Sequence, residues 1–535
     1  MMREGGPGAR LSLSRRAFLR LTGAGLLAGI TSTACTPAAR PQAVSEAGPR
    51  FGGTLRVAIA GEPPALDPTF TTAYITRQIA LHMFELLLHQ DGRFNPVPML
   101  ASAFAHEEQG RVLRLELRTG VKFHNRKPMT ADDVVASLLR YARMTGYGRT
   151  LFGRVADVAK SGDYAVRLVF KEPTAVAPIF LSAHADAPVI PKELAEAYPD
   201  GPLKEFVGTG PYRFGEHLPD RYVSLKRYQD YAAVDLPPSG NSGRKVAYLH
   251  EIRFIPVPEP SVRLDGLATG EFDFAQELNP DSYDRLRADP NLEVQVVRTA
   301  WYCAHFNKAQ ESILSSRTLR HALLAAVDAE RLARLAFGRP EFYRLYPSMS
   351  APETPWYSEA GKEYYNQKNP DKARRLLREA AYDGRPLRFI ATKEYTWNYN
   401  LALGLKEQFE TVGVKVDLQL MDWAALVRTR SRRDAWDIFI TGHLATDHPL
   451  TQPFINESWP GFWKNPEKDR LVERLMVAAT QAEARQYIDA LERLKWEDAA
   501  FAMICEGSLL HAYRRKLRGY RTDWFDPLFW SCWLE

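Results

Sequence analysis

Hydrophobic positions after residue 50 switch repeatedly between the spacing of strands and the spacing of helices. Continuous apolar runs and strict alternation predict strands, whereas apolar residues three and four positions apart predict helices. The predicted strands cover residues 54–60, 111–118, 166–170, 251–257 and 436–441. The predicted helices cover residues 74–88, a segment that follows Thr130, residues 316–337 and a segment that follows Asn369. This mixture predicts an α/β fold.

Start and stop signals agree with these helices. Thr130-Ala131-Asp132-Asp133 resembles a capping box, which opens a helix through reciprocal hydrogen bonds. Gly338 and Pro340 follow residues 316–337 and predict the end of one long helix there. Pro370 suits the first turn of the helix after Asn369.

Residues 387–420 give the clearest supersecondary pattern. A strand at 387–391, a helix at 399–411 and a strand at 414–420 form a β-α-β unit. Such a unit places its two strands in parallel with a right-handed crossover. We expect the following strand, 436–441, to end in a loop at residue 442.

The length of 535 residues exceeds what one hydrophobic core supports, so two or three lobes are expected. Hydrophobic residues make up 45% and charged residues 25%, as in ordinary globular proteins. Residues 1–34 hold five arginines and one glutamate, which supply much of the formal charge of +6. The remainder is too weakly basic to indicate nucleic-acid binding.

The N-terminal segment is typical of an export signal. Ser14–Arg20 resembles the twin-arginine motif, and residues 21–34 form a glycine-broken apolar run that is too short to span a membrane. We therefore expect a signal peptide at 1–34 and a flexible tether at 35–50.

Cys35 follows Ser32-Thr33-Ala34, which partly resembles a lipoprotein box. Ser32 stands where a leucine-like residue is usual, so two outcomes are open. Cys35 is lipidated and anchors the protein to a membrane, or the signal is cleaved and the protein is released.

Four cysteines occur, at positions 35, 303, 505 and 532. None belongs to a C-x-x-C pair, and no Cys/His spacing indicates zinc. An oxidising compartment would permit a Cys505–Cys532 bridge. We expect no cofactor.

Two glycine- or charge-rich motifs invite a functional interpretation. His124, Asp132 and Asp133 lie together in sequence, but acidic residues at a helix N-terminus have an ordinary structural role. Gly208-Thr209-Gly210-Pro211 lacks the lysine and spacing of a phosphate-binding loop, so we expect a turn.

Five segments, in order along the chain, resemble the bacterial ABC-transporter solute-binding protein family 5, which serves oligopeptide, dipeptide and nickel importers. They are Gly52–Leu55 with Leu66–Pro68, Leu117–His124 with Pro128–Val134, Val207–Tyr212, Arg263–Leu264 with Gly270–Asp273, and Phe306–Asn307 with Leu319–Ala322.

This resemblance implies a fold like that of type II periplasmic binding proteins, with two α/β lobes, an extra domain and a ligand cleft at the hinge. By similarity, lobe I comprises residues 51–75, 194–297 and 506–535, the extra domain 76–193, and lobe II 298–505. The implied protein is a monomeric receptor, not an enzyme, in the periplasm or on the outer face of the cytoplasmic membrane. It would deliver a peptide or peptide-like small organic solute to an ABC permease.

The resemblance also suggests how a ligand amine is held. The loop that contains Glu62 lines the cleft in peptide-binding relatives, so Glu62 is a candidate partner of the amine; a solvated loop glutamate is the alternative. Aligned on Pro449, the aspartate that pairs with the peptide amine in relatives falls on Ala445. Either Asp447 or Glu62 replaces it, or the ligand has no free amine there.

Aromatic and histidine side chains are further candidates for ligand binding. Flat aromatic faces suit sugars, ring systems and peptide side chains, although core packing is the alternative for each residue. The candidates are Tyr74, Trp301, Tyr302, Trp397, Trp423 and His443. His305, His443 and His448 leave a nickel-type role open.

Other functions remain as alternatives. The ligand could be an opine, a glycan or a metal complex, and the same fold could present a ligand to a sensor. An exported hydrolase is the rival class, but the sequence has no G-x-S-x-G, H-E-x-x-H or C-x-x-C motif.

Overall fold

The computed structural model describes residues 48–535 except 72, 184, 447, 479 and 522–525. Residues 48–535 form one compact unit. The predicted signal peptide at 1–34, the candidate lipidation site Cys35 and the candidate ligand residue Asp447 lie outside the described residues. Within the described part, the helices lack the length and apolar character needed to span a membrane.

A large mixed sheet runs through most of the chain. Its strand order is β15-β14-β16-β12-β17-β11-β1-β10-β9-β8, and β13 pairs with β17 outside this path. The strands are β1 Thr54–Ile59, β8 Tyr212–Leu218, β9 Tyr222–Arg227, β10 Glu251–Pro256, β11 Phe274–Leu278, β12 Leu292–Phe306, β13 Tyr343–Arg344, β14 Leu387–Ala391, β15 Val416–Leu420, β16 Ile438–Leu444 and β17 Phe501–Arg514.

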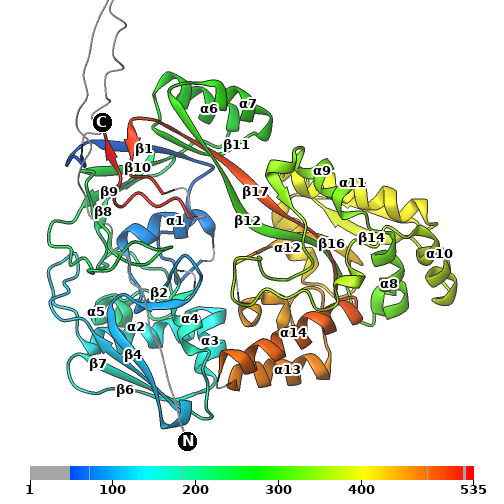
Figure 1. Ribbon diagram of the computed structural model, residues 1–535, viewed down its shortest axis with the longest axis horizontal. Helices are drawn as coiled ribbons and strands as arrows, with labels where there is room; N and C mark the ends of the chain where they lie inside the picture. The colour runs from blue at the N-terminus through cyan, green and yellow to red at the C-terminus, as the bar shows by residue number, and fades with distance from the viewer. Residues whose placement is uncertain (1–47, 72, 184, 447, 479, 522–525) are drawn as a thin grey trace, which may run out of the picture. The chain divides into compact units, whose positions relative to one another are not determined.

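Strands β12 and β17 connect the two ends of this sheet. They have 15 and 14 residues and pair antiparallel from Leu292↔Arg514 to His305↔Phe501. Figure 1 shows them side by side, linking the group that contains β1 and β8–β11 to the group that contains β14–β16. We call these the first and second strand groups. The chain therefore passes between the groups along two long strands, as a hinge requires.

A smaller antiparallel sheet has the order β4-β5-β7-β6. Its strands are β4 Ala101–Glu107, β5 Val112–Leu117, β6 Val155–Lys160 and β7 Ala165–Phe170, and a separate pair is formed by β2 Leu88–Gln90 and β3 Pro96–Pro98. Leu113 and Leu115 of β5 are buried, whereas Arg114 and Glu116 are partly exposed. The half-exposed strand that the alternating pattern at 111–118 predicted is thus confirmed.

Helices cover both sheets. They are α1 Tyr74–Met83, α2 Ala131–Met144, α3 Gly146–Phe152, α4 Ala177–Ser182, α5 Lys192–Ala197, α6 Pro260–Thr269, α7 Tyr283–Ala288, α8 Arg317–Ala326, α9 Ala329–Phe337, α10 Pro370–Glu379, α11 Thr396–Thr411, α12 Trp423–Arg430, α13 Pro466–Val477 and α14 Gln481–Glu497. The two short strands β18 Leu517–Arg518 and β19 Trp533–Leu534 pair near the C-terminus.

Several predicted elements are confirmed. Strands β14 and β15 pair in parallel on either side of α11, as the β-α-β pattern predicted. Helix α2 begins with the predicted capping box, since the Thr130 N–H donates to the Asp133 carboxylate at 3.0 Å. The Asn369 side chain caps α10 by accepting from the Lys372 N–H at 2.9 Å.

The single helix predicted at 316–337 was wrong, because the segment forms α8 and α9. Val327 is extended, and the Asp328 carboxylate accepts the Arg331 N–H at 3.1 Å. A short acidic side chain competes for backbone donors inside a helix and favours the N-cap instead. Asp328 therefore starts a second helix.

Two further boundaries also differ from prediction. The helix expected to reach residue 88 ends at Met83, whose carbonyl accepts the Gly210 N–H at 2.9 Å. The strand expected to stop at residue 441 continues to Leu444, because Gly442, His443 and Leu444 pair with β12. The predicted loop thus begins later, and His443 lies in a strand.

Cys505 and Cys532 are both free and buried, so the structure does not contain the bridge that the sequence permitted. Burial raises the pKa of both thiols, which keeps them protonated.

Candidate functional site

A cavity with a volume of about 1230 Å³ lies between several chain segments. Its wall combines four chain segments that are distant in sequence, at 68–71, 144–154, 450–460 and 472–476, together with Lys171, Glu172 and Asp186. The first follows strand β1, the second covers the end of α2 and α3, and the last two follow β16 and include part of α13. Elements attached to both strand groups therefore share one cavity.

Contacts across this cavity join the small sheet region to α13. The Thr174 hydroxyl donates a buried hydrogen bond of 2.5 Å to the Met476 carbonyl. Arg154 forms an ion pair with Glu473, and both residues line the cavity. Figure 1 shows α3 and α13 next to each other at this place. These contacts join α13 to the segments that follow α3 and β7, beside the cavity.

Asp186 is the most buried carboxylate in the cavity wall. Its side chain lies in the segment between α4 and α5 and is only 6% exposed. Among the residues that the structure describes, neither carboxylate oxygen has a hydrogen-bond partner. Burial raises the pKa of Asp186 to about 7, and its own backbone N–H and Arg77 offset part of that effect.

The cavity rim carries the opposite charge. Arg149 and Lys171 are exposed and line the cavity. Arg149 donates to the Arg143 carbonyl at 2.8 Å and Lys171 to the Gly153 carbonyl at 2.7 Å. Neither bond neutralises the cation. The site thus combines a buried acid with exposed cations, and the exposed acids Glu172 and Glu473 line the same wall.

Aromatic side chains also face the cavity. Phe70 is 48% exposed although it is large and apolar, and Tyr147 and Trp459 line the same space. The Trp459 ring packs edge-on against His305 at 4.8 Å between centroids. An exposed phenylalanine beside a cavity is a common feature of ligand sites.

Three predicted residues come together away from this wall. Tyr302 of β12 and Trp397 of α11 have ring centroids 4.5 Å apart. Tyr395, which was not predicted, stacks on Trp397 at 5.6 Å and meets Trp423 edge-on at 5.1 Å. The four rings form a row from buried Tyr302 through Trp397 and exposed Tyr395 to Trp423, which we call the aromatic row.

Glu277 of β11 lies close enough to the aromatic row to influence it. Burial is the main cause that raises the pKa of the Tyr302 and Tyr395 hydroxyls, and the charge of Glu277 raises both pKa values further. Glu277 interrupts the regular pairing of β11 with β17 and has a positive φ of 50°. Burial also raises the pKa of its own carboxyl group.

Glu62 and Tyr74 do not line this cavity. The Glu62 carboxylate forms a short contact with His217 and accepts the Asp220 N–H at 3.3 Å. Tyr74 begins α1, where burial and the nearby Asp526 charge raise the pKa of its hydroxyl. Glu62 thus has a partner within the protein already.

Trp301 and His443 are buried and pack against each other. Their ring centroids are 4.7 Å apart, and Trp301 is fully buried. The His305 and His443 Nε2 atoms are hydrogen-bonded at 2.8 Å. Burial lowers the pKa of both imidazoles, to about 3 for His443, so the pair is neutral.

Cys303 joins these two histidines in a potential metal-binding group. The candidate ligand atoms of Cys303, His305 and His443 lie within 4.8 Å of one another, and all three residues are buried. Neutral imidazole and a cysteine sulfur suit a soft transition metal. A purely structural role also explains the two histidines, because they already form a hydrogen bond with each other.

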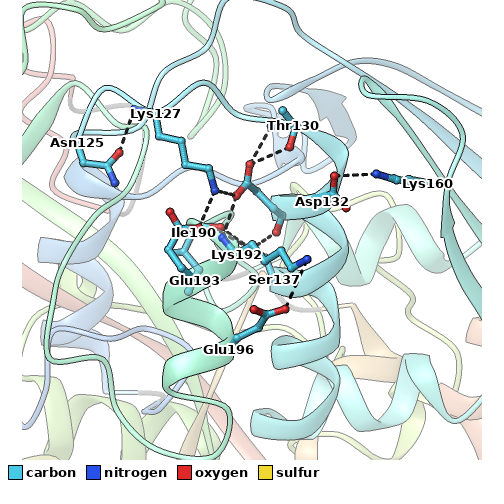
Figure 2. A network of polar contacts seen from close by, with 11 residues as sticks. Asn125, Lys127, Thr130, Asp132, Ser137, Lys160, Ile190, Lys192, Glu193 and Glu196 are labelled. Atoms are coloured by element: carbon cyan, nitrogen blue, oxygen red, sulfur yellow. Dashed lines mark hydrogen bonds and ion pairs between the residues drawn. The ribbon is translucent and has the colours of Figure 1, made fainter.

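The motif at 117–134 has a structural role. Lys127 contacts Asp133 and Glu193, each at 2.6 Å, and the Lys192 N–H donates to Asp133 at 2.8 Å. Figure 2 shows this network, which joins the start of α2 to the start of α5. Asp132 points away from it and pairs with Lys160 at 2.8 Å.

His124 belongs to the same structural framework. Its Nε2 donates to the Gly210 carbonyl at 3.1 Å, and its Nδ1 accepts the Gly208 N–H at 3.2 Å. The predicted turn at 208–211 is therefore fixed by His124, and burial lowers the pKa of that imidazole to about 4.

The sequence interpretation missed Asp186, although a signal was present. Asp186 is the only acidic residue between Thr174 and Lys192 in a segment rich in apolar residues. A lone carboxylate in such a segment is either paired or functional. Phe70 gave no comparable signal, because its exposure depends on tertiary structure.

We compared the chain with models of known protein families, and one family matches. Residues 95–465, more than half of the sequence, match the family described as bacterial extracellular solute-binding proteins, family 5 Middle. The chain belongs to this family. The resemblance inferred from five short segments is thereby confirmed.

Individual relatives of this family 5 protein extend the match over nearly the whole chain. It is 27% identical over 504 residues to the "Probable peptide ABC transporter periplasmic-binding protein y4tO" of Sinorhizobium fredii, covering 89% of this chain and 93% of the relative. It is 23% identical over 491 residues to the glutathione-binding protein GsiB of Escherichia coli K12, with coverage of 88% and 92%.

A solved structure supports the fold. The periplasmic binding protein DppA of Helicobacter pylori, in complex with the peptide STSA, matches with a TM-score of 0.76 and 19% identity. The match covers 91% of this chain and 99% of DppA. The predicted fold, an α/β fold like that of type II periplasmic binding proteins, is therefore confirmed.

Proposed function

We propose that this family 5 protein is an extracytoplasmic receptor that captures a peptide or peptide-like small organic solute and delivers it to the permease of an ABC importer. The family assignment supports a solute-binding role. The names of the relatives from S. fredii and E. coli indicate peptides and glutathione as their solutes.

The observation that carries this proposal is the cavity shared by elements of both strand groups. A volume of about 1230 Å³ is large for a small-molecule site, where 300–1000 Å³ is roughly typical, and suits a short peptide. Because Thr174 and Arg154 contact α13 across the cavity, closing it would enclose a ligand. A ligand that binds the closed form better than the open form shifts the population toward closure.

We propose the predicted lobes as the moving parts. Lobe I (51–75, 194–297 and 506–535) and lobe II (298–505) would rotate about β12 and β17, with the extra domain (76–193) carried along. Delivery follows if the permease recognises the closed form, and no covalent chemistry is needed.

The aromatic row is a second proposed contact surface for the ligand. Tyr302, Trp397 and Trp423 offer ring faces to apolar side chains, and Tyr395 is open to solvent. The pairing of Glu62 with His217 favours Glu62 as a structural residue over a partner for the ligand amine. Asp447 remains a candidate partner, whereas Trp301 and His443 would act by supporting the wall.

We further propose export by the twin-arginine route, a monomeric state, and membrane attachment only through Cys35 if that residue is lipidated. A non-peptide solute, such as an opine, a glycan or a metal complex, is the alternative cargo. The exported hydrolase is the alternative class.

Mass spectrometry of the molecules that co-purify with protein made in a periplasm tests the proposal. We expect a peptide-like compound at about one molecule per protein chain, which raises the melting temperature when added back and is recovered unchanged. Conversion of that compound to a product would contradict the receptor function and favour the hydrolase.

A further inference from the structure

Asp186 has an environment that a structural carboxylate would not have. Its side chain is more than nine-tenths buried and lines the cavity. No hydrogen bond or ion pair to either oxygen is formed by any residue within the described part of the chain. By contrast, the buried Asp67 carboxylate forms an ion pair with Arg140 at 2.6 Å and accepts two backbone N–H groups.

Two neighbours, Arg77 and Tyr141, interact electrostatically with Asp186 but form their hydrogen bonds with other groups. Arg77 forms an ion pair with Asp526 at 3.0 Å. The Tyr141 hydroxyl, whose pKa is raised in part by Asp186, donates to the Phe180 carbonyl at 3.2 Å. Neither residue donates a hydrogen bond to Asp186.

Leaving a carboxylate buried and unpaired costs free energy. Folded proteins accept such a cost mainly where the group acts on a ligand. The position of Asp186 in the wall of the 1230 Å³ cavity identifies where that ligand would be. The missing partner must be a hydrogen-bond donor and is most favourable as a cation.

We propose that Asp186 anchors a cationic group of the captured solute, an ammonium or a guanidinium. This inference rests on the proposed function, because it assumes that the solute occupies the cavity. The same wall also carries the exposed cations Arg149 and Lys171, beside the acids Glu172 and Glu473, and the two cations offer partners to an anionic group of the solute. A solute with a cation at one end and an anion at the other fits this charge distribution.

The first test needs no ligand and uses the full mature chain, refolded after denaturation so that any bound solute is removed. Asp186→Asn retains the shape of the side chain but removes its charge, so we expect a higher melting temperature at pH 8. Glu172→Gln, an exposed acid in the same cavity wall, is the matched control and should leave the melting temperature unchanged. A lower melting temperature for Asp186→Asn would show a structural partner and overturn the proposal.

The second test measures binding by calorimetry. The probes are trialanine with a free amino terminus, its N-acetylated form, arginine amide and a neutral disaccharide. We expect binding only by probes that carry a cation, with affinity reduced at least about 30-fold by Asp186→Asn. Asp157→Asn, which removes an exposed acid outside the cavity wall, should leave the affinity unchanged.

The outcomes separate the two proposals. Equal binding of a cationic probe by the wild type and Asp186→Asn, or tighter binding of an uncharged probe, would overturn the role of Asp186 and leave the receptor function intact. If the wild type binds no probe, capture of peptide-like solutes loses its support, and the melting temperatures still decide whether Asp186 is an unpaired acid.

Discussion

The hydroxyl of Thr174 and the carbonyl of Met476 form a buried hydrogen bond of 2.5 Å between residues 302 positions apart in the chain. Thr174 follows the small sheet, and Met476 belongs to α13. The bond therefore reports whether these two regions are closed on the cavity. Substitutions that remove this bond or the Arg154–Glu473 pair therefore test the proposed closing motion.

Thr174→Val should favour the open form. The substitution keeps the side-chain shape but removes the donor, which costs about 1 kcal/mol in the closed form. We expect about fivefold weaker ligand binding by calorimetry and a larger radius of gyration by X-ray scattering. Thr150→Val, at an exposed position of the same cavity wall, is the control. Equal affinities of Thr174→Val and the wild type would contradict a role in closure.

The ligand-free protein should lose stability with rising pH because of Asp186. Its pKa is raised from 3.8 to about 7, so the folded state binds the proton more tightly than the unfolded state. The free energy of unfolding therefore falls as pH rises from about 4 to about 7, by about 4 kcal/mol from this group.

Urea unfolding at a series of pH values measures this contribution. The buried histidines act in the opposite direction, so the comparison is the wild type minus Asp186→Asn. That difference should fall through the stated pH range. A difference that is constant with pH would mean that Asp186 has the same pKa in both states.

The Asp67–Arg140 pair should be essential for stability. Both side chains are fully buried, and Asp67 lies directly before the cavity segment 68–71. Arg140→Met leaves the carboxylate unpaired, so we expect a loss of about 3–5 kcal/mol in unfolding free energy. In contrast, Asp132→Asn breaks only an exposed pair with Lys160 and should leave the melting temperature unchanged. Similar effects of both variants would refute this assignment.

The turn at 208–211 should tolerate no side chain at Gly208. A Cβ atom there would lie 2.1 Å from the Met83 carbonyl oxygen. Gly208→Ala should therefore lower the unfolding free energy by about 1–3 kcal/mol or more, as measured by urea unfolding. Gly201→Ala, where no atom lies within 4 Å of the added Cβ, should have little effect. A stable Gly208→Ala variant would show that the turn can move.

Local patterns predicted the fold well but not the site. The spacing of apolar residues predicted the β-α-β unit at 387–420. The capping residues Thr130 and Asp133 predicted the start of α2. The break at Asp328 was missed because an apolar pattern continues across it, although the capping preference of aspartate overrides that pattern.

The cavity could not be predicted in the same way, since the segments of its wall meet only in the tertiary structure. The sequence interpretation named Tyr302, Trp397 and Trp423 among its candidate ligand residues, but nothing local distinguished them from Phe70 or Tyr147. The lack of a partner for Asp186 is likewise a property of the folded chain and not of its sequence.

The central claim is that the protein captures a solute and releases it unchanged. Its most direct test is calorimetric titration of the refolded wild type with the compound that co-purifies from the periplasm, followed by mass spectrometry of the mixture. The account predicts saturable binding of about one molecule per chain, with the compound recovered intact. No binding, or recovery of a reaction product, would contradict it.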